Sequence, residues 1–392
     1  MKDLRAAKLF AAIAAAVLAV GACTTGGGAS PSSPVATSGA SPTAAASPDQ
    51  SSGTSAEPSG SAASSQPSGS GGGDGEYVIG VSNTLQGNGW REEMICSAKA
   101  EALASGQVSK MVIAHRTTDA AGQLDDLRNL IASDVDAIIV NPVSPDAITA
   151  ALDEAVDKGI TVVAVDQGVN QADAYLMSND QEAYGYLGAK WLFEQLGGEG
   201  NVVYQRGIAG AQADTDRDTG FKRALAENPG ITVVAEQATN WDPATAVQQI
   251  GEFLAGGQPV DGVWTSGVDS SIVSAFKTAG KPYVPIVGAD NSEFVSQLIN
   301  EDGLVGAAVT NPAAVGGAGV ALALRVLNGE PPAEQQQLLT PEVWDNQTPE
   351  GKASLEGAVD PSIDPLWPLN ISIPDWTTYT KEQLLACKGP GE

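Results

Sequence analysis

The chain has 392 residues and a formal net charge of -27 at pH 7, with 47 acidic against 20 basic side chains. A surface this acidic repels phosphate backbones, which argues against a nucleic-acid-binding role. The single histidine, His115, and the three cysteines form no cluster with metal-ligand spacing, so we expect no metal site and no cofactor.

The chain begins with the pattern of a secretory signal. Three basic residues precede an apolar run from Leu9 to Val20, which is too short to span a bilayer comfortably. The sequence Gly21-Ala22-Cys23 that follows resembles a bacterial lipobox. This resemblance implies a signal peptide over residues 1–22, cleavage before Cys23 and lipid attachment to its sulfur. The alternatives are an ordinary signal peptide with a chance cysteine, or a membrane-spanning helix.

Residues 23–75 have the composition of a disordered tether. After Cys23 they are almost wholly Ser, Gly, Ala, Pro and Thr, with no aromatic residue and no Lys or Arg. Such a segment cannot bury enough apolar surface to offset the entropy lost on ordering. We therefore expect it to link the membrane anchor flexibly to a folded body that begins near residue 76.

From there to residue 330, strand-like and helix-like segments alternate. Short apolar runs predict strands at 77–81, 108–114, 137–140, 161–165, 201–205, 231–236, 260–264, 284–288 and 304–309. Stretches with helical periodicity predict helices at 91–105, 119–132, 145–157, 181–196, 214–227, 243–255, 269–279, 291–300 and 313–327. This alternation indicates parallel sheets with crossover helices. There are too many units for one simple sheet, so the predicted fold class is α/β with two doubly wound parallel-sheet lobes.

The pattern changes over residues 331–392, which are rich in proline and include three tryptophans. We expect an extended tail that lies over the body. With Cys23 lipidated, Cys96 and Cys387 are an even pair outside the cytoplasm, which favours a disulfide between them. The alternative is two unrelated free thiols.

Polar and aromatic residues gather where the predicted strands end. In open α/β sheets, ligands bind at the carboxyl ends of the strands. Carboxylates and amides both suit hydroxyl groups, and tryptophan offers a flat face to the C–H side of a sugar or polyol. The candidate ligand-binding residues are Asn88, Trp90, Asp166, Gln167, Arg217, Trp241, Ser266, Asp290, Thr310 and Asn311. We expect no catalytic residue.

Each type of candidate has a purely structural alternative. The side chains of Asn291 and Asp242, which also follow strands, could cap the next helix. Trp90 and Trp241 could be ordinary core residues, and Arg217 could form a surface ion pair.

Several motifs together resemble the type I periplasmic sugar-binding proteins of ABC importers, in particular the ribose-binding-like group. The motifs are Ile79-Gly80-Val81-Ser82, Asn88-Gly89-Trp90, Ile138-Ile139-Val140-Asn141-Pro142, Val163-Ala164-Val165-Asp166, Gly207-Ile208-Ala209-Gly210, Arg217, Gly220-Phe221 and Val287-Gly288-Ala289-Asp290. The resemblance implies two lobes joined by three crossings that close over a sugar. It implies an N-lobe over residues 76–178 and 311–330, a C-lobe over 179–310, and a tail over 331–392.

The resemblance also implies roles for the candidates. Asn88 supplies an amide, and Trp90 and Trp241 stack on the ligand from opposite lobes. Asp166 and Arg217 grip its hydroxyls, and Asp290 is a second-lobe carboxylate.

Three departures separate this chain from the ribose-type pattern. Gln167 stands where an arginine follows the binding aspartate, residues 265–269 replace an Asn-Asp turn, and Thr310-Asn311 stands where a glutamine is common. The implied ligand class is therefore a sugar or sugar alcohol rather than ribose itself.

The interpretation that follows is a monomeric, non-enzymatic lipoprotein on the outer face of the cell membrane that delivers its ligand to ABC permease subunits. Three alternatives stay open: a receptor for a sugar-like signal such as an autoinducer, a structural cell-envelope lipoprotein, and a glycoside hydrolase. A hydrolase would use two carboxylates such as Asp166 and Asp290, but Arg217 beside them would keep both ionised.

Overall fold

The computed structural model describes residues 75–392. The predicted signal peptide, the lipidation site Cys23 and the tether up to residue 74 lie outside the described residues. Within residues 75–392, no helix combines the length and the apolar character needed to cross a bilayer.

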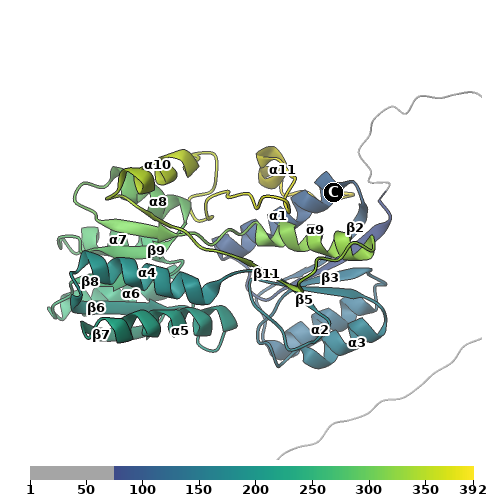
Figure 1. Cartoon of the computed structure of the whole chain (residues 1–392), viewed down its shortest axis with the longest axis horizontal. Helices are drawn as coiled ribbons and strands as arrows, with labels where there is room; N and C mark the ends of the chain where they lie inside the picture. Colours follow the sequence, from purple (N-terminus) through teal and green to yellow (C-terminus); the bar gives the residue numbers. More distant parts are fainter. Residues whose placement is uncertain (1–74) are drawn as a thin grey trace, which may run out of the picture. The chain divides into compact units, whose positions relative to one another are not determined.

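Lobe 1 is built on a six-stranded sheet with the strand order β11-β5-β4-β3-β1-β2, and all of its pairings are parallel. The strands are β1 (Tyr77–Asn83), β2 (Val108–His115), β3 (Ala137–Asn141), β4 (Thr161–Val165), β5 (Tyr175–Asn179) and β11 (Gln336–Leu339). Helices cover both faces: α1 (Gly89–Ser105) and α9 (Val315–Leu327) on one, α2 (Ala120–Ile131) and α3 (Thr149–Asp157) on the other (Figure 1). The central strand β3 is therefore buried along its whole length, as its continuous apolar run predicts.

Lobe 2 repeats this plan with the strand order β12-β10-β9-β8-β6-β7. Its strands are β6 (Glu199–Arg206), β7 (Gly230–Ala238), β8 (Gly262–Trp264), β9 (Ile286–Ala289), β10 (Gly306–Val309) and β12 (Val343–Asp345). Only β12 runs antiparallel to its neighbour. One face carries α4 (Gln181–Gln195) and α5 (Gln212–Glu227), and the other carries α6 (Pro243–Ala255), α7 (Asp269–Thr278) and α8 (Ser292–Asn300). The predicted class of two doubly wound parallel-sheet lobes is confirmed.

Two glycines let α4 and α5 approach closely beside the site. A Cβ atom on Gly185 would lie 2.0 Å from the carbonyl oxygen of Arg217, and one on Gly220 would lie 2.0 Å from that of Glu182. The two backbones therefore touch, because neither glycine carries a side chain. This contact holds Arg217, on α5, against the first turn of α4.

The tail differs from the extended segment expected from its prolines. It contributes β11 to the sheet of lobe 1 and β12 to the sheet of lobe 2, and it adds α10 (Pro349–Ala358) and α11 (Lys381–Ala386). The strand β5 was also not predicted. Its last two residues, Ser178 and Asn179, are polar, so the five-residue segment lacks a continuous apolar run.

Within residues 75–392 the chain crosses between the lobes four times. Three crossings join β5 to α4, β10 to α9, and β11 to β12. The fourth lies in the tail, where Ile371 packs on the core of lobe 2 and Ile373 is part of the core of lobe 1. The tail then reaches α11, which lies against α1, and Cys387 forms the predicted disulfide with Cys96 (Figure 1).

Candidate ligand-binding site

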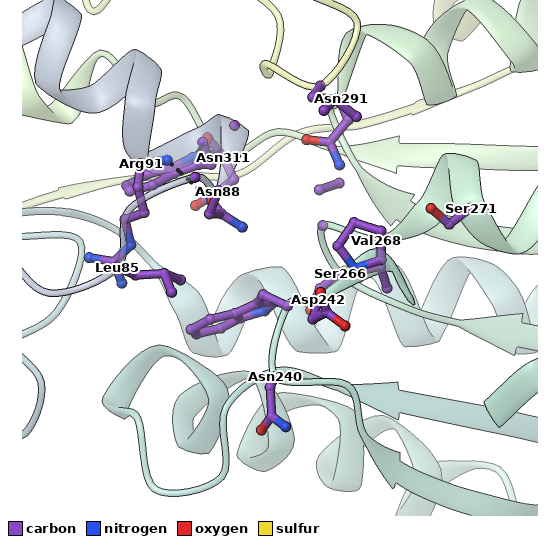
Figure 2. Close-up of a pocket in the computed structure, with 18 of the residues that line it drawn as sticks. Leu85, Asn88, Arg91, Asn240, Asp242, Ser266, Val268, Ser271, Asn291 and Asn311 are labelled. Carbon is purple, nitrogen blue, oxygen red and sulfur yellow. Dashed lines mark hydrogen bonds between the residues drawn. The ribbon is translucent and has the colours of Figure 1, made fainter. Parts of the chain in front are cut away.

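A cavity of about 210 Å³ lies between the two lobes. It is smaller than the roughly 300–1,000 Å³ typical of drug-sized ligand pockets, so it suits one small molecule. Figure 2 shows Asn88 and Arg91 on one side of it and Ser266, Val268 and Asn291 on the other. The polar residues that line it include Asn88, Arg91, Asp166, Arg217, Asn240, Asp242, Ser266, Asn291 and Asn311.

The structure brings seven of the ten predicted site residues to this cavity. They are Asn88, Trp90, Asp166, Arg217, Trp241, Ser266 and Asn311. They come from segments spread over more than 220 residues, and the strand ends of both sheets bring them together. Gln167, Asp290 and Thr310 do not line the cavity.

Each of those three side chains is engaged elsewhere. Gln167 donates to Asn141 Oδ1 at 2.9 Å and accepts from Ala213 N of lobe 2 at 3.3 Å, so it connects the lobes. The Thr310 hydroxyl accepts from Glu342 N at 2.9 Å beside β12. Asp290 is fully buried, and its Oδ2 accepts from Asn311 N at 2.9 Å.

A hydrogen-bonded series of charged and amide groups forms the base of the cavity. Arg91 Nη2 lies 3.6 Å from Asp166 Oδ2, and both side chains are nearly buried. Gln181 Nε2 donates to Asp166 Oδ1 at 3.0 Å, while Gln181 Oε1 accepts from Arg217 Nε at 2.8 Å. The Gln181 amide thus joins the carboxylate of lobe 1 to the guanidinium of lobe 2. Arg217 is 5% exposed, which rules out the surface ion pair considered as its alternative.

Arg91 is a residue that the sequence reasoning missed. Besides Asp166, it contacts Asn83, to whose Oδ1 it donates at 3.0 Å. Burial lowers the pKa of Arg91, and Asp166 opposes that shift. The sequence signal was indirect: an arginine is absent after Asp166, where Gln167 stands, and Arg91 supplies a guanidinium to the same carboxylate from α1.

Two tryptophans line the cavity from different lobes. Trp90, on α1, donates through Nε1 to the carbonyl oxygen of Asn311 at 2.6 Å. Trp241 follows β7, and its ring lies so close to Gly207 that a Cβ there would be 2.2 Å from it. Trp90 also packs against the core of lobe 1, so it combines the core contact considered as an alternative with a face on the cavity, whereas Trp241 lies against Gly207.

The backbone around the cavity is locally strained. Within residues 75–392, six non-glycine residues have positive φ, and three of them line the cavity: Asp166 (65°), Asn240 (57°) and Trp241 (53°). Left-handed conformations cost such residues on the order of 1–3 kcal/mol and concentrate at functional sites. Here these backbone conformations place the Asp166 carboxylate, the Asn240 amide and the Trp241 indole at the cavity.

Helix capping was the structural alternative for Asp242 and Asn291, and only Asp242 caps a helix. Asp242 Oδ1 accepts from Thr245 N at 2.7 Å and caps α6, although the residue also lines the cavity. Asn291 makes no side-chain cap to α8; its Nδ2 instead donates to Asp269 Oδ2 at 2.8 Å. Asn291 is therefore a candidate contact that is not among the ten predicted site residues.

Two buried carboxyl groups lie behind the lobe 2 wall. Burial raises the pKa of Asp269 and of Asp290 to about 7 each, against hydrogen bonds that lower it. Asp290 Oδ1 has no hydrogen-bond partner among residues 75–392. No group of three or more His, Cys, Asp or Glu side chains able to hold a metal occurs in this part of the chain.

Two parallel-sheet α/β lobes joined by repeated crossings, with a ligand-sized cavity between them, define a type I periplasmic binding protein. The family described as periplasmic binding protein domain matches residues 79–331, more than half of the chain. The chain belongs to that family.

Individual relatives agree with this assignment. The chain is 32% identical over 216 residues to the xylitol-binding protein of Mycolicibacterium smegmatis, a match that covers 54% of this chain and 62% of that protein, less than two thirds of its length. It is 24% identical over 258 residues to the ribose import binding protein of Bacillus subtilis, covering 65% and 83%. A solved ABC transporter solute binding protein from Thermobispora bispora is similar with a TM-score of 0.68 and 26% identity, over 79% of this chain and 94% of that one.

Proposed function

We propose that this protein binds a sugar or sugar alcohol between its lobes and delivers it to an ABC importer. The observation that carries the proposal is the cavity itself, where guanidinium, carboxylate and amide groups converge between two tryptophans. Groups that donate and accept in several directions suit a polyhydroxylated ligand, and the indoles suit its C–H faces. Relatives named for xylitol and ribose binding support the same ligand class.

The charges around the cavity favour a neutral ligand. The charged residues that line the cavity are two arginines, Arg91 and Arg217, and two aspartates, Asp166 and Asp242, so their formal charges cancel. The buried Asp269 and Asp290 have raised pKa values, so neither needs a cationic ligand to offset a full charge at neutral pH. Hydroxyl groups can bond to both the guanidinium and the carboxylate.

The remaining parts of the proposal concern location and partners. A signal peptide over residues 1–22 and a lipid on Cys23 would place the folded body outside the cytoplasm on the outer face of the membrane, joined to it by the tether of residues 23–75. There a monomer would meet the ABC permease subunits. No cofactor or catalytic step is needed.

A thermal-shift screen of the purified protein against xylitol, D-ribose, L-arabinose, D-galactose and myo-inositol tests the proposal. A ligand at a hundredfold excess over its Kd stabilises the folded state by about 2.7 kcal/mol. We expect at least one compound to raise Tm in the wild type, and Arg217→Met to abolish the shift. Small-angle scattering should show compaction with the same compound, because contacts from both lobes favour the closed state.

Three outcomes would contradict this function. Absence of any shift across pentoses, hexoses and polyols would favour a structural envelope lipoprotein. Conversion of the sugar during incubation, detected by chromatography, would indicate an enzyme. Binding without any importer-dependent uptake in cells would favour a signal receptor.

A further inference from the structure

We propose that the C-terminal tail forms one wall of the ligand site and that Leu366 contacts the bound ligand through its apolar side chain. This inference rests on the proposed function, because it identifies an additional contact for the same sugar or polyol. The tail lies outside residues 79–331, which match the periplasmic binding protein domain. The wall is therefore built by residues outside the segment that matches this domain.

The first observation is the position of the segment. Pro365 and Leu366 line the cavity together with Trp90 and Trp241. Leu366 is 58% exposed, the most exposed of the large apolar side chains among residues 75–392. An exposed leucine at a cavity between two tryptophans offers apolar surface that a ligand would bury.

The second observation is how the tail is held on lobe 2. Ser292 N donates to the carbonyl oxygen of Trp367 and Glu293 N to that of Pro365, both at 2.9 Å. These are the first N–H groups of α8, which a side-chain cap would otherwise satisfy. Because the tail caps the helix, the Asn291 side chain is free to lie at the cavity. The tail thus supplies Leu366 and also releases Asn291 from capping.

The third observation is the contact with lobe 1. A Cβ atom on Gly89, next to Trp90, would lie 1.9 Å from the carbonyl oxygen of Leu366. The tail backbone therefore touches the first turn of α1, and farther along it is joined to the same helix by the Cys96–Cys387 disulfide. The wall is fixed to both lobes at the edge of the cavity.

The wall should select ligands by their apolar edge. The Leu366 side chain has no donor or acceptor, so a ligand hydroxyl directed at it loses its hydrogen bonds to water without replacement. A ligand that presents C–H groups at this position instead gains buried apolar area. The segment Pro365–Leu366 would therefore determine which face of a polyol or sugar is accepted.

The test compares the full chain with Leu366→Ala, Leu366→Met and, as a control, Leu385→Ala. Leu385 is an exposed leucine of the same tail, on α11, that does not line the cavity. Calorimetric titration uses xylitol first and then the other compounds of the screen. We expect Leu366→Ala to weaken the compound bound by the wild type about tenfold, as loss of apolar contact predicts. The Leu366→Met variant should retain most of the affinity and Leu385→Ala all of it.

Equal affinity of wild type and Leu366→Ala, with both folded, would overturn the inference. If the wild type binds none of the compounds, the proposed function fails. Acrylamide quenching of tryptophan fluorescence then tests separately whether Leu366 covers the cavity. Removing the Leu366 side chain should then increase quencher access relative to Leu385→Ala. Unchanged quenching would overturn the wall as well.

Discussion

At the scale of single residues, the site depends on charged groups that are held in place before any ligand arrives. Asp166 is contacted by Arg91, Asn141 and Gln181, and its own backbone is in the left-handed region. Such pre-ordering lowers the entropy that binding would otherwise have to overcome. A residue that holds a contact residue in place can therefore affect ligand affinity as much as the contact residue itself.

Arg91 is the clearest such neighbour. Arg91→Met should lower ligand affinity at least about tenfold, because hydrogen bonds to charged groups contribute on the order of 1.5–3 kcal/mol and Asp166 loses its guanidinium partner. Titration calorimetry measures the loss. Arg128→Met, a change at a surface arginine paired with Asp125, should bind like the wild type. Equal affinity of both variants would remove Arg91 from the site.

The buried carboxyl group of Asp290 leads to a prediction about how the stability of the fold depends on pH. Its pKa is about 7 in the folded protein and near 4 when unfolded, so between these values the folded state keeps a proton that the unfolded state has lost. This group therefore stabilises the fold less and less as pH rises from about 4 to 7, by up to roughly 4 kcal/mol in total.

Asp290→Asn should remove this contribution. Urea unfolding from pH 4.5 to 8 should show the wild type losing stability relative to the variant as pH rises. The control is Asp302→Asn, at an exposed position, which should follow the wild-type curve. Parallel curves for Asp290→Asn and the wild type would show that the carboxyl is ionised throughout.

At the scale of elements, the closely packed helix pair α4 and α5 positions Gln181 and Arg217, through which Asp166 of lobe 1 is linked to lobe 2. Gln181 begins α4, Arg217 lies on α5, and the glycine contact brings their side chains within hydrogen-bond distance. A helix pair of this kind transmits small displacements directly to the site, since tightly packed interiors cannot absorb added volume.

Gly220→Ala tests that contact. The added Cβ would lie 2.0 Å from Glu182 O, so the helices must separate, at a cost of about 1–3 kcal/mol in stability. Ligand affinity should fall with it, because Arg217 moves away from Gln181. Gly251→Ala is the matched control: this glycine lies within α6 and an added Cβ meets nothing within 4 Å, so the change should be neutral or slightly stabilising. Thermal unfolding and titration of both variants measure the difference.

At the scale of the whole described body, the tail adds a fourth connection to a hinge for which the family resemblance implied three. It covers the edge of the cavity on its way from α10 to α11, and its end is joined covalently to α1. Opening of the lobes must therefore move or stretch this segment as well as the other three crossings, which join β5 to α4, β10 to α9 and β11 to β12.

The disulfide should contribute strongly to stability. Its cysteines are 291 residues apart, and the chain-entropy description gives an upper value of about 5 kcal/mol for a loop of that length. The double variant Cys96→Ser/Cys387→Ser should unfold at lower urea concentration than the oxidised wild type. Adding a reductant should lower wild-type stability to the same level. Unchanged stability in both cases would mean that the tail is held by its packing and hydrogen bonds alone.

Much of this protein is readable from local sequence patterns. Apolar runs and helical periodicity predicted nine strands and nine helices, and so two doubly wound lobes, because each pattern spans only a few consecutive residues. The position of polar residues after strands led to seven residues that line the cavity. An even number of remaining cysteines led to the pair Cys96 and Cys387, which the structure joins.

Only the tertiary structure decided which side chains face the cavity. Gln167, Asp290 and Thr310 follow strands as Asp166 does, but their side chains form hydrogen bonds with residues distant in sequence and do not line the cavity. Arg91 and Leu366 also line the cavity, but no local sequence pattern indicates this, because Arg91 lies on a helix and Leu366 in a proline-rich segment. Local patterns determine elements, whereas the orientation of a side chain at their junction depends on the packing of segments that are far apart along the chain.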